Sequence, residues 1–145
     1  MVIIRSMFQA DLVDIAEIER ENYSPWSVES LVQELEAFGA ICLVAETSDS
    51  AIIGWCACRV CRPEAELLKI AVQQKSRGLG IGCLLLGHLF RELQKREITS
   101  LFLEVRSKNR TAMKFYDRTG FRHVGSRPGY YADPPDSALI LRKDF

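Results

Sequence analysis

A basic, glycine-rich turn lies between an apolar segment and a helical pattern in residues 67–93. The apolar segment ends at Val72, and glycines stand at Gly78, Gly80 and Gly82. Glycine leaves room for several backbone N–H groups to converge at the start of a helix, where the positive end of the helix dipole also points. The sequence therefore predicts an anion-binding turn, with phosphate as its usual ligand.

Glu104 is a lone carboxylate in the otherwise apolar segment from Ser100 to Val105. A carboxylate in such a segment is costly unless it is paired or opens onto a site. One interpretation is structural, because Arg106 shares its face at i+2 and can form an ion pair with it. The other interpretation is a general base at a site onto which the end of the strand opens.

The cysteines are the other residues that could react or bind metal. Their number is odd and they lie in apolar stretches, so we expect them to be reduced and buried: they are Cys42, Cys56, Cys58, Cys61 and Cys83. A metal or redox site made from Cys56, Cys58 and Cys61 is the alternative. On a strand, however, Cys61 points away from the other two, and neither histidine is near them in sequence. We expect no metal site.

The composition limits the classes of function. The chain has 145 residues, 48% of them hydrophobic, which fits one domain with a full core. Its 19 basic residues balance 19 acidic ones, so no overall field favours nucleic acid or an anionic membrane. The apolar runs are far shorter than a bilayer span, and no basic leader with an apolar stretch begins the chain. We predict a single domain, residues 1–145, in the cytoplasm, without direct binding to nucleic acid or membrane.

The elements that position these residues follow from the periodicity of the apolar side chains. Helical spacing begins after residue 11 and again after Ser27, a good N-cap whose helix carries an apolar stripe ending at Phe38. Further helices follow the glycines and Asn109. Strand-like runs are 2–7, 40–45, 52–60, 66–72, 100–105, 121–125 and 137–141. The order β-α-α-β-β-β-α-β-α-β-β predicts an α/β (α+β) fold with a central mixed seven-stranded sheet and helices on both faces.

Two common phosphate motifs do not fit the glycine turn. A Walker A loop ends in Gly-Lys-Ser or Gly-Lys-Thr, whereas Lys75-Ser76 precedes the glycines here. A dinucleotide fingerprint needs G-x-G-x-x-G, but Gly82 is followed by Cys83, and the first strands do not form a βαβ repeat. These mismatches disfavour ATP, GTP and NAD.

The turn does match the pattern Q/R-x-x-G-x-G/A in the frame that runs from Arg77 to Gly82. This pattern is the pyrophosphate-binding signature of the GNAT acetyltransferase superfamily, and this frame keeps the family's usual gap after the strand. From end to end the chain resembles the RimI-type N-terminal acetyltransferases of ribosomal proteins. The matching segments are Pro25-Trp26-Ser27, Glu64 to Val72, Arg77 to Gly82, Leu103 to Asn109, Ala112, Phe115-Tyr116, Gly120-Phe121 and Arg127 to Tyr131.

The resemblance implies the GNAT acyl-CoA N-acyltransferase fold, in which the sheet splays between strands four and five. It also implies acetyl-CoA as co-substrate and no metal. Backbone N–H groups of the glycine turn would hold the pyrophosphate, and the pantetheine would run along the end of strand four. Asn109 resembles the family asparagine that touches the cofactor, although it is also a good helix N-cap. The residues expected at the cofactor are Ile70, Ala71, Val72, Arg77, Gly78, Leu79, Gly80, Ile81, Gly82, Asn109 and Tyr116.

The resemblance also implies two catalytic residues, Glu104 as general base and Tyr116 as general acid. An α-amino group has a pKa of about 8, so a base must remove its proton before it attacks at neutral pH. A phenol pKa of about 10 lies above the thiol value of about 8.5, so tyrosine can protonate a departing thiolate. Tyr116 could equally be a core aromatic residue. Attack in a ternary complex needs no acetylated cysteine.

The acceptor side is expected at Trp26, Tyr130 and Tyr131, which would flank a groove for a peptide N-terminus. The alternative is that these aromatic residues only close the core at loop ends. Two positions depart from the RimI pattern: Lys69 replaces a common asparagine, and Ser137 replaces a usual acidic residue. Both departures concern the peptide-binding side.

The function predicted from the sequence is transfer of the acetyl group of acetyl-CoA to a protein N-terminal α-amino group. The expected acceptor is a ribosomal protein with N-terminal alanine. An alternative is a GNAT enzyme that acetylates a lysine or a small-molecule amine. A non-catalytic acyl-CoA-binding module is the alternative from another class, and the presence of both Glu104 and Tyr116 disfavours it.

Overall fold

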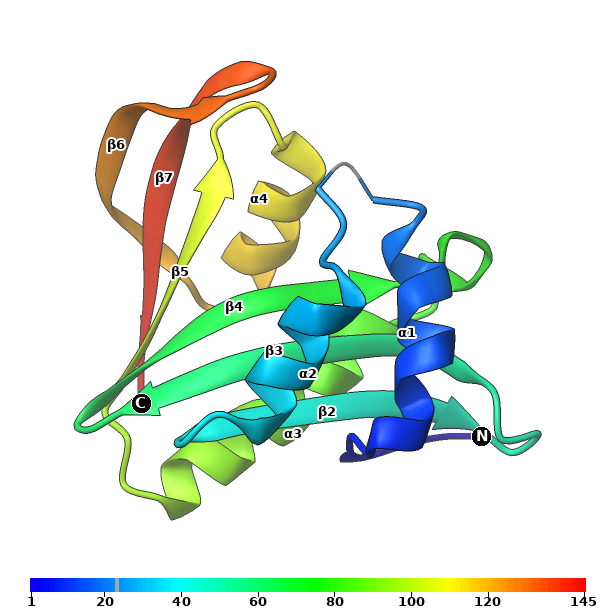
Figure 1. Ribbon diagram of the computed structural model, residues 1–145. Coiled ribbons are helices and arrows are strands. Elements are labelled where there is room, and N and C mark those ends of the chain that lie inside the picture. The colour runs from blue at the N-terminus through cyan, green and yellow to red at the C-terminus, as the bar shows by residue number, and fades with distance from the viewer. Residues whose placement is uncertain (23) are drawn as a thin grey trace.

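The structure of the protein is a computed structural model that describes residues 1–22 and 24–145 (Figure 1). Within these residues, seven strands form one sheet in the order β1-β2-β3-β4-β5-β7-β6, and only β4 and β5 pair in parallel. The predicted mixed sheet and the predicted order of elements are confirmed. The elements are β1 Val2–Ser6, η1 Gln9–Asp11, α1 Leu12–Glu19, α2 Val28–Glu36, β2 Ala40–Thr47, β3 Ile52–Cys61, β4 Glu64–Val72, η2 Gln74–Ser76, α3 Ile81–Lys95, β5 Ser100–Arg106, α4 Arg110–Arg118, β6 Arg122–Ala132 and β7 Pro135–Asp144.

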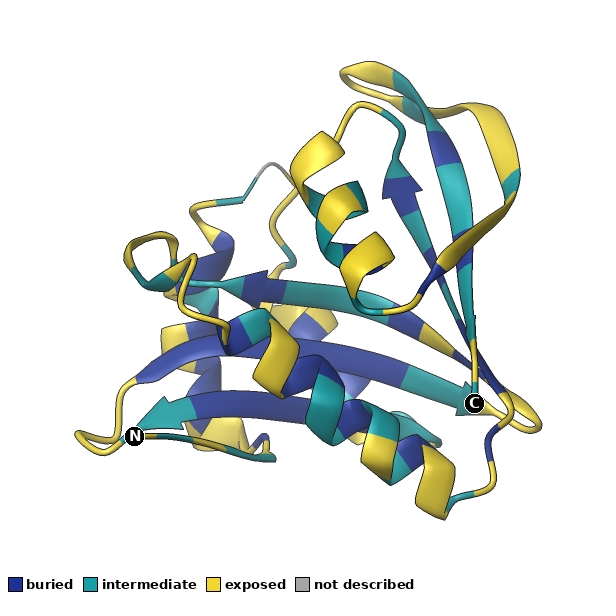
Figure 2. Cartoon of the chain, turned by 180° about the vertical axis from the view of Figure 1, so that it is seen from behind, coloured by how far each residue is buried: buried dark blue, intermediate teal, exposed yellow. Residues whose placement is uncertain are grey.

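The helices cover both faces of the sheet, as expected. Figure 1 shows α1 and α2 in front of the strands, and Figure 2 shows α3 and α4 on the opposite side. The core under α3 includes Leu85 and Leu89 of the helix and Leu101 of β5. The core under α1 and α2 includes Ile15 and the buried Trp55. Each helix therefore buries its apolar stripe against one face of the sheet.

The sheet opens between β4 and β5. Among the described residues, these strands pair only where Glu64–Glu66 lie beside Ser100–Phe102. Beyond that point the strands diverge, and Figure 1 shows β5 rising away from β4. The expected splay is confirmed, and it leaves one edge of β4 without a neighbouring strand over residues 67–72.

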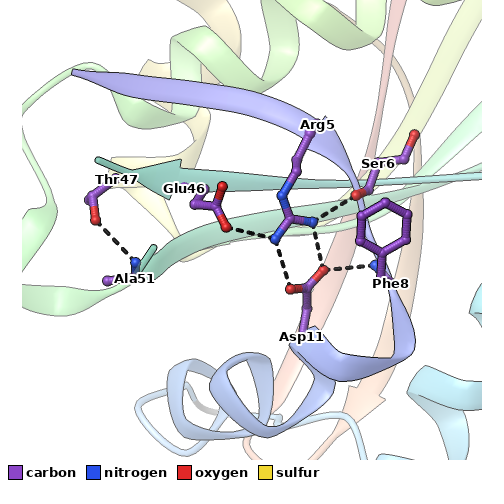
Figure 3. A network of polar contacts seen from close by, with 7 residues as sticks. All are labelled: Arg5, Ser6, Phe8, Asp11, Glu46, Thr47 and Ala51. Carbon is purple, nitrogen blue, oxygen red and sulfur yellow. Dashed lines mark hydrogen bonds and ion pairs between the residues drawn. The ribbon is translucent and has the colours of Figure 1, made fainter. Parts of the chain in front are cut away.

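A polar network fastens the beginning of the chain to the sheet (Figure 3). The Arg5 guanidinium donates two hydrogen bonds of 2.9 Å to the Asp11 carboxylate and one of 2.8 Å to Glu46. Asp11 also accepts the backbone N–H of Phe8 at 2.7 Å. Hydrogen bonds from Arg5 lower the pKa of the Asp11 carboxyl group. This network connects β1, the start of α1 and β2.

Several expectations about single elements are wrong. The last two strands are longer than predicted, so Tyr130 and Tyr131 lie within β6 rather than in a loop. Phe38 is fully exposed, because α2 ends at Glu36 and Ala37 is extended.

None of the described helices combines the length and apolar character needed to cross a bilayer.

The expectation that all five cysteines are buried is also wrong. Cys56 and Cys58 lie in the core, where burial raises the pKa of the Cys58 thiol to about 12. Cys61 is exposed because β3 ends there, beyond the cover of the helices, and Cys83 is exposed near the start of α3. All five are free thiols. No cluster of three His, Cys, Asp or Glu side chains that could hold a metal occurs in the described part of the chain.

Candidate active site

The glycine turn has the backbone conformation that only glycine adopts easily. Gly78 and Gly80 have φ angles of 78° and 82°, and a side chain at either position would meet no neighbouring atom within 4 Å. The backbone dihedral, and not crowding, therefore requires glycine at both positions. Gly80 is the N-cap of α3, and no described side chain caps the helix. The first N–H groups of α3 thus have no partner within the helix and form a cradle for an anion.

Two contacts hold this turn against its surroundings. The Nε of Arg77 donates a 3.0 Å hydrogen bond to the carbonyl oxygen of Val72, which folds the side chain against the end of β4. A Cβ at Gly82 would lie 2.9 Å from the ring of Phe115, so this glycine lets α4 approach α3 closely. The glycine turn is therefore in contact with the end of β4, and the first turn of α3 is in contact with the second half of α4.

The end of β4 offers backbone groups to a ligand. On one side, Ala71 and Val72 pair with Trp55 and Gly54 of β3. On the other side, within the described chain, no β4 residue after Glu66 pairs with β5. Peptide groups along that edge are available to an extended ligand, which can add to the sheet as another strand does. The side chain of Ala71 is buried and packs in the core under α1 and α2.

Glu104 stands on β5 beside this opening. Its Oε2 is buried and has no hydrogen-bond partner among residues 1–22 and 24–145. Nε of Arg127 on β6 lies 3.5 Å from this same oxygen and forms an ion pair with it. Arg106, the partner considered from the sequence, donates to the carbonyl oxygens of Pro134 and Asp133 at 2.7 and 3.2 Å. A buried carboxylate oxygen without a donor is suited to accept a proton or a hydrogen bond from a ligand.

Tyr116 lies on the opposite side of the sheet from Glu104. It packs in the core under α3 with Leu103 and Val105, whose side chains alternate with that of Glu104 along β5. Burial, with a smaller contribution from Cys56, raises the pKa of the Tyr116 hydroxyl group. No described residue forms a hydrogen bond with this hydroxyl group. The phenol is therefore a neutral donor at pH 7, and the two predicted catalytic side chains lie on opposite faces of the sheet.

Asn109 is the N-cap of α4. Its side-chain oxygen accepts the backbone N–H of Ala112 at 3.1 Å, so the capping interpretation is confirmed. Its position at the start of α4 is the end of that helix next to β5. A contact with the cofactor stays a prediction.

Tyr130 and Tyr131 lie together near Glu104. Their rings meet edge to face with centroids 5.0 Å apart, and the Arg106 guanidinium lies 4.1 Å from the centre of the Tyr131 ring. Partial burial, and then the negative charge of Glu104, raise the pKa of Tyr131. Pairing of β6 with β7 shifts between Arg127 and Tyr131, where Gly129 has a φ of 64°. This irregular stretch displaces Tyr130 toward solvent, where about half of the side chain is exposed.

Trp26 lies between α1 and α2, on the face of the sheet that those helices cover. Its ring packs edge to face against Trp55, with centroids 5.5 Å apart. It also lines a hollow of about 500 Å³ together with Ser27, Glu34 and Arg59. The Arg59 guanidinium donates to both oxygens of Glu34, at 2.9 and 2.6 Å. Trp26 is therefore both packed and accessible, which fits an anchor at a binding surface.

Sequence reasoning missed three polar residues of this region. Arg127 lies within a motif of the resemblance, but only the pairing of β6 and β7 places it beside Glu104. Glu66 is exposed on β4, and its pKa is raised by partial burial and by the charge of Glu104. Glu19 resembles the solvated acids around it in α1, yet it is 1% exposed. No local pattern distinguishes it, because its partners come from distant strands.

Comparison with known proteins places the chain in a family. The model of the acetyltransferase (GNAT) family matches residues 12–121. A [ribosomal protein bS18]-alanine N-acetyltransferase of Haemophilus influenzae is 34% identical over 97% of this chain and 97% of its own length. The protein of the same name in Escherichia coli K12 is 32% identical over 95% and 94%. Both relatives therefore align with nearly the whole chain.

Solved structures agree with these relatives. The crystal structure of the ribosomal-protein-S18-alanine N-acetyltransferase from Escherichia coli superposes with a TM-score of 0.91, covering 99% of this chain and 94% of the other at 29% identity. The PaiA N-acetyltransferase of Thermoplasma acidophilum, solved in complex with coenzyme A, superposes with a TM-score of 0.84 at 23% identity. The second likeness concerns the fold alone.

Proposed function

This chain belongs to the GNAT acetyltransferase family and is an acetyl-CoA-dependent N-acetyltransferase, and we propose that it acetylates the N-terminal α-amino group of a ribosomal protein that begins with alanine. The observation that carries the proposal is the buried Oε2 of Glu104, which accepts no hydrogen bond from a described residue and lies beside the opening between β4 and β5. The names of the relatives from Haemophilus influenzae and Escherichia coli support the choice of acceptor. We place the reaction in the cytoplasm, where ribosomal proteins are made.

Acetyl-CoA supplies the acetyl group as a thioester. We assign its pyrophosphate to the N–H groups between Gly78 and Gly82, because the start of α3 lacks a side-chain cap and its dipole favours negative charge. Arg77 adds a positive charge at the same turn. The free edge of β4 at Ile70, Ala71 and Val72 provides hydrogen-bonding groups for the amides of the pantetheine arm. The side-chain NH₂ of Asn109 can contribute one further hydrogen bond.

Glu104 removes the proton from the acceptor amine. An α-amino group with a pKa of about 8 is mostly an ammonium at neutral pH and cannot attack until it loses a proton. Oε2 of Glu104, which accepts no hydrogen bond from a described residue, can accept that proton directly or through one water molecule. Arg127 lies 3.5 Å from the same oxygen as an ion-pair partner without donating a hydrogen bond to it.

Tyr116 donates the proton that the departing thiolate needs. Because burial raises its pKa, the phenol keeps its proton throughout the physiological pH range. Since Tyr116 and Glu104 lie on opposite faces of the sheet, we assign base and acid to opposite sides of a group held between β4 and β5. Holding both reactants together makes the attack direct, and no cysteine needs to carry the acetyl group.

The acceptor peptide lies on the face covered by α1 and α2. We assign the acceptor groove to Trp26, in the turn between those helices, and to the tyrosine pair of β6, because aromatic side chains make rigid anchors at binding surfaces. The charge of Glu104 contributes to the raised pKa of Tyr131.

The test is incubation with acetyl-CoA and a panel of acceptors, with the modified atom identified by fragmentation mass spectrometry. The panel contains peptides beginning with alanine, the same peptides with a blocked N-terminus and an internal lysine, and polyamines. We expect acetylation of the free α-amino group. Acetylation of lysine or of a polyamine alone would make the chain a GNAT of another acceptor class. Binding of acetyl-CoA in calorimetry without release of CoA from any acceptor would indicate a binding module.

A further inference from the structure

Glu19, the last residue of α1, is a buried carboxylate that the mechanism above does not use. Its side chain is 1% exposed. Oε1 accepts the backbone N–H of Trp26 at 3.0 Å. Oε2 accepts the indole N–H of Trp55 and the side-chain N–H of Asn22, each at 3.1 Å. The ammonium of Lys69 lies 3.4 Å from Oε1.

These contacts join three parts of the protein through one carboxylate. Asn22 and Trp26 belong to the turn between α1 and α2, Trp55 to β3, and Lys69 to β4. Burying a carboxylate costs several kcal/mol unless hydrogen bonds and an opposite charge offset it. Here donors reach both oxygens and Lys69 supplies the charge. These hydrogen bonds and this ion pair can therefore form together only when the turn occupies one position relative to the sheet.

The turn held in this way carries the aromatic wall of the acceptor groove. Glu19 holds the backbone of Trp26, while Trp55 packs against its ring at 5.5 Å. The ammonium of Lys69 also contacts the turn, because it donates a 3.4 Å hydrogen bond to the carbonyl oxygen of Ser24. Lys69 also lies in the part of β4 that no longer pairs with β5, next to the opening at which the acceptor must arrive.

We propose that Glu19 is a positioning residue for the acceptor: with Lys69 it fixes the turn between α1 and α2, so that Trp26 stands ready to bind the peptide. The inference rests on the proposed function, because it assigns Trp26 to the acceptor groove. When Glu19 is changed, the turn occupies the binding-competent position for a smaller fraction of the time. The apparent affinity for the acceptor falls by that fraction, whereas the chemistry in the bound complex is unchanged.

The test compares Glu19→Gln with the matched control Glu17→Gln. Glu17 lies on the same helix, is 62% exposed, and pairs only with Arg20 among the described residues. Glutamine keeps the shape of the Glu19 side chain, but it places an NH₂ group where one carboxylate oxygen accepts hydrogen bonds. It also removes the negative charge that pairs with Lys69. We expect the KM for the acceptor peptide to rise about tenfold or more, the loss associated with a hydrogen bond to a charged group. The kcat and the Kd of acetyl-CoA should stay within about twofold, and Glu17→Gln should match the wild type.

A second readout does not depend on activity. The amide hydrogen of Trp26 should exchange with solvent slowly in the wild type and clearly faster in Glu19→Gln, as followed by hydrogen exchange with fragment analysis. Lys69→Met provides a second variant, and it carries the test alone if Glu19→Gln does not fold. Its side chain is 20% exposed, and its loss leaves Glu19 with neutral donors only.

An unchanged acceptor KM in both variants would overturn the inference, and so would a fall in kcat without a change in KM. Unchanged exchange at Trp26 would overturn it as well. If the wild type acetylates no peptide, the proposed function fails, and the exchange of Trp26 still decides whether Glu19 holds the turn. The two failures are therefore distinguishable.

Discussion

Replacing Glu104 with glutamine separates a catalytic role from a structural one, because the structure predicts a large loss of activity with little change in stability. The variant removes a proton acceptor whose buried Oε2 has no described hydrogen-bond partner. A general base typically contributes a factor of about 10² to 10⁴ to the rate. We therefore expect kcat to fall at least about a hundredfold at pH 7, which corresponds to about 2.7 kcal/mol of transition-state stabilisation.

Stability should change little in the same variant. Among residues 1–22 and 24–145, Glu104 pairs only with Arg127, at 3.5 Å, and 56% of the Arg127 side chain is exposed. Solvent screens such pairs, and their loss costs no more than about 1 kcal/mol. For a chain of 145 residues this corresponds to a shift of the melting temperature of no more than about 4 °C. A structural carboxylate would instead leave kcat intact and lower the melting temperature.

The assay measures CoA release and N-terminal acetylation between pH 6.5 and 9.5, with calorimetry of acetyl-CoA binding beside it. Above the amine pKa of about 8 the acceptor is neutral without help, so the deficit of Glu104→Gln should narrow with rising pH. Glu66→Gln is the matched control, since Glu66 lies close enough for the charge of Glu104 to raise its pKa. We expect it to keep kcat within about threefold. A deficit of Glu104→Gln that stays constant with pH, or an equal loss in Glu66→Gln, would refute the assignment of Glu104 as base.

Three further predictions concern the acid, the turn and the N-terminal network. Tyr116→Phe should lower kcat about tenfold or more with an unchanged Kd for acetyl-CoA, as steady-state kinetics and calorimetry will show. Because burial raises the folded-state pKa of Tyr116 above the unfolded value of about 10, its neutral form contributes stability that is present below pH 10 and lost above it. Alkaline unfolding should therefore be delayed in the phenylalanine variant, and an identical alkaline profile would contradict this reasoning. Gly82→Ala places a methyl group 2.9 Å from the ring of Phe115. We therefore expect the free energy of unfolding, measured by thermal unfolding, to fall by about 1 to 3 kcal/mol and acetyl-CoA to bind more weakly. An unaltered affinity for acetyl-CoA would exclude this contact from the cofactor site. Asp11→Asn removes a carboxylate whose pKa the hydrogen bonds from Arg5 lower, and it should cost about 2 kcal/mol at pH 7. A carboxyl group whose pKa is lower in the folded state adds stability above its unfolded pKa of about 3.9, and this stability is lost as pH falls through the folded-state pKa. The difference in stability between Asp11→Asn and the wild type should therefore vanish in acid denaturation. A difference that stays constant with pH would contradict the role of the Asp11 charge.

The sequence predicted those features that depend on neighbours along the chain. The caps at Ser27 and Asn109 were predictable because each side chain accepts an N–H only three residues away. The φ angles of Gly78 and Gly80 were implicit in a motif that places glycine before a helix. The order of strands and helices followed from the periodicity of apolar side chains, which the two cores confirm.

Features that depend on the pairing of distant strands were not predictable. The sequence offered Arg106 as the partner of Glu104, but the register of β5, β7 and β6 brings Arg127 to it instead. The irregular stretch at Gly129 that displaces Tyr130 arises within one long hairpin that was predicted as two short strands. Local patterns carry no information on such registers, because they are set by contacts between whole strands.

The sequence by itself predicted the kind of chemistry. Residue type and spacing indicated a glycine turn before α3 and a carboxylate in β5, and the resemblance to a known family indicated a tyrosine in α4. Only the tertiary structure decided how these residues meet. The divergence of β4 from β5 after Glu66 opens the sheet, and Glu104 and Tyr116 lie on opposite faces of that sheet. The tertiary structure also decided the environment of Glu19. In the sequence this residue resembles a solvated acid of α1, but in the fold it contacts the indole of Trp55 and the ammonium of Lys69. Burial and charge pairing are properties of the folded chain, so no local pattern reveals them.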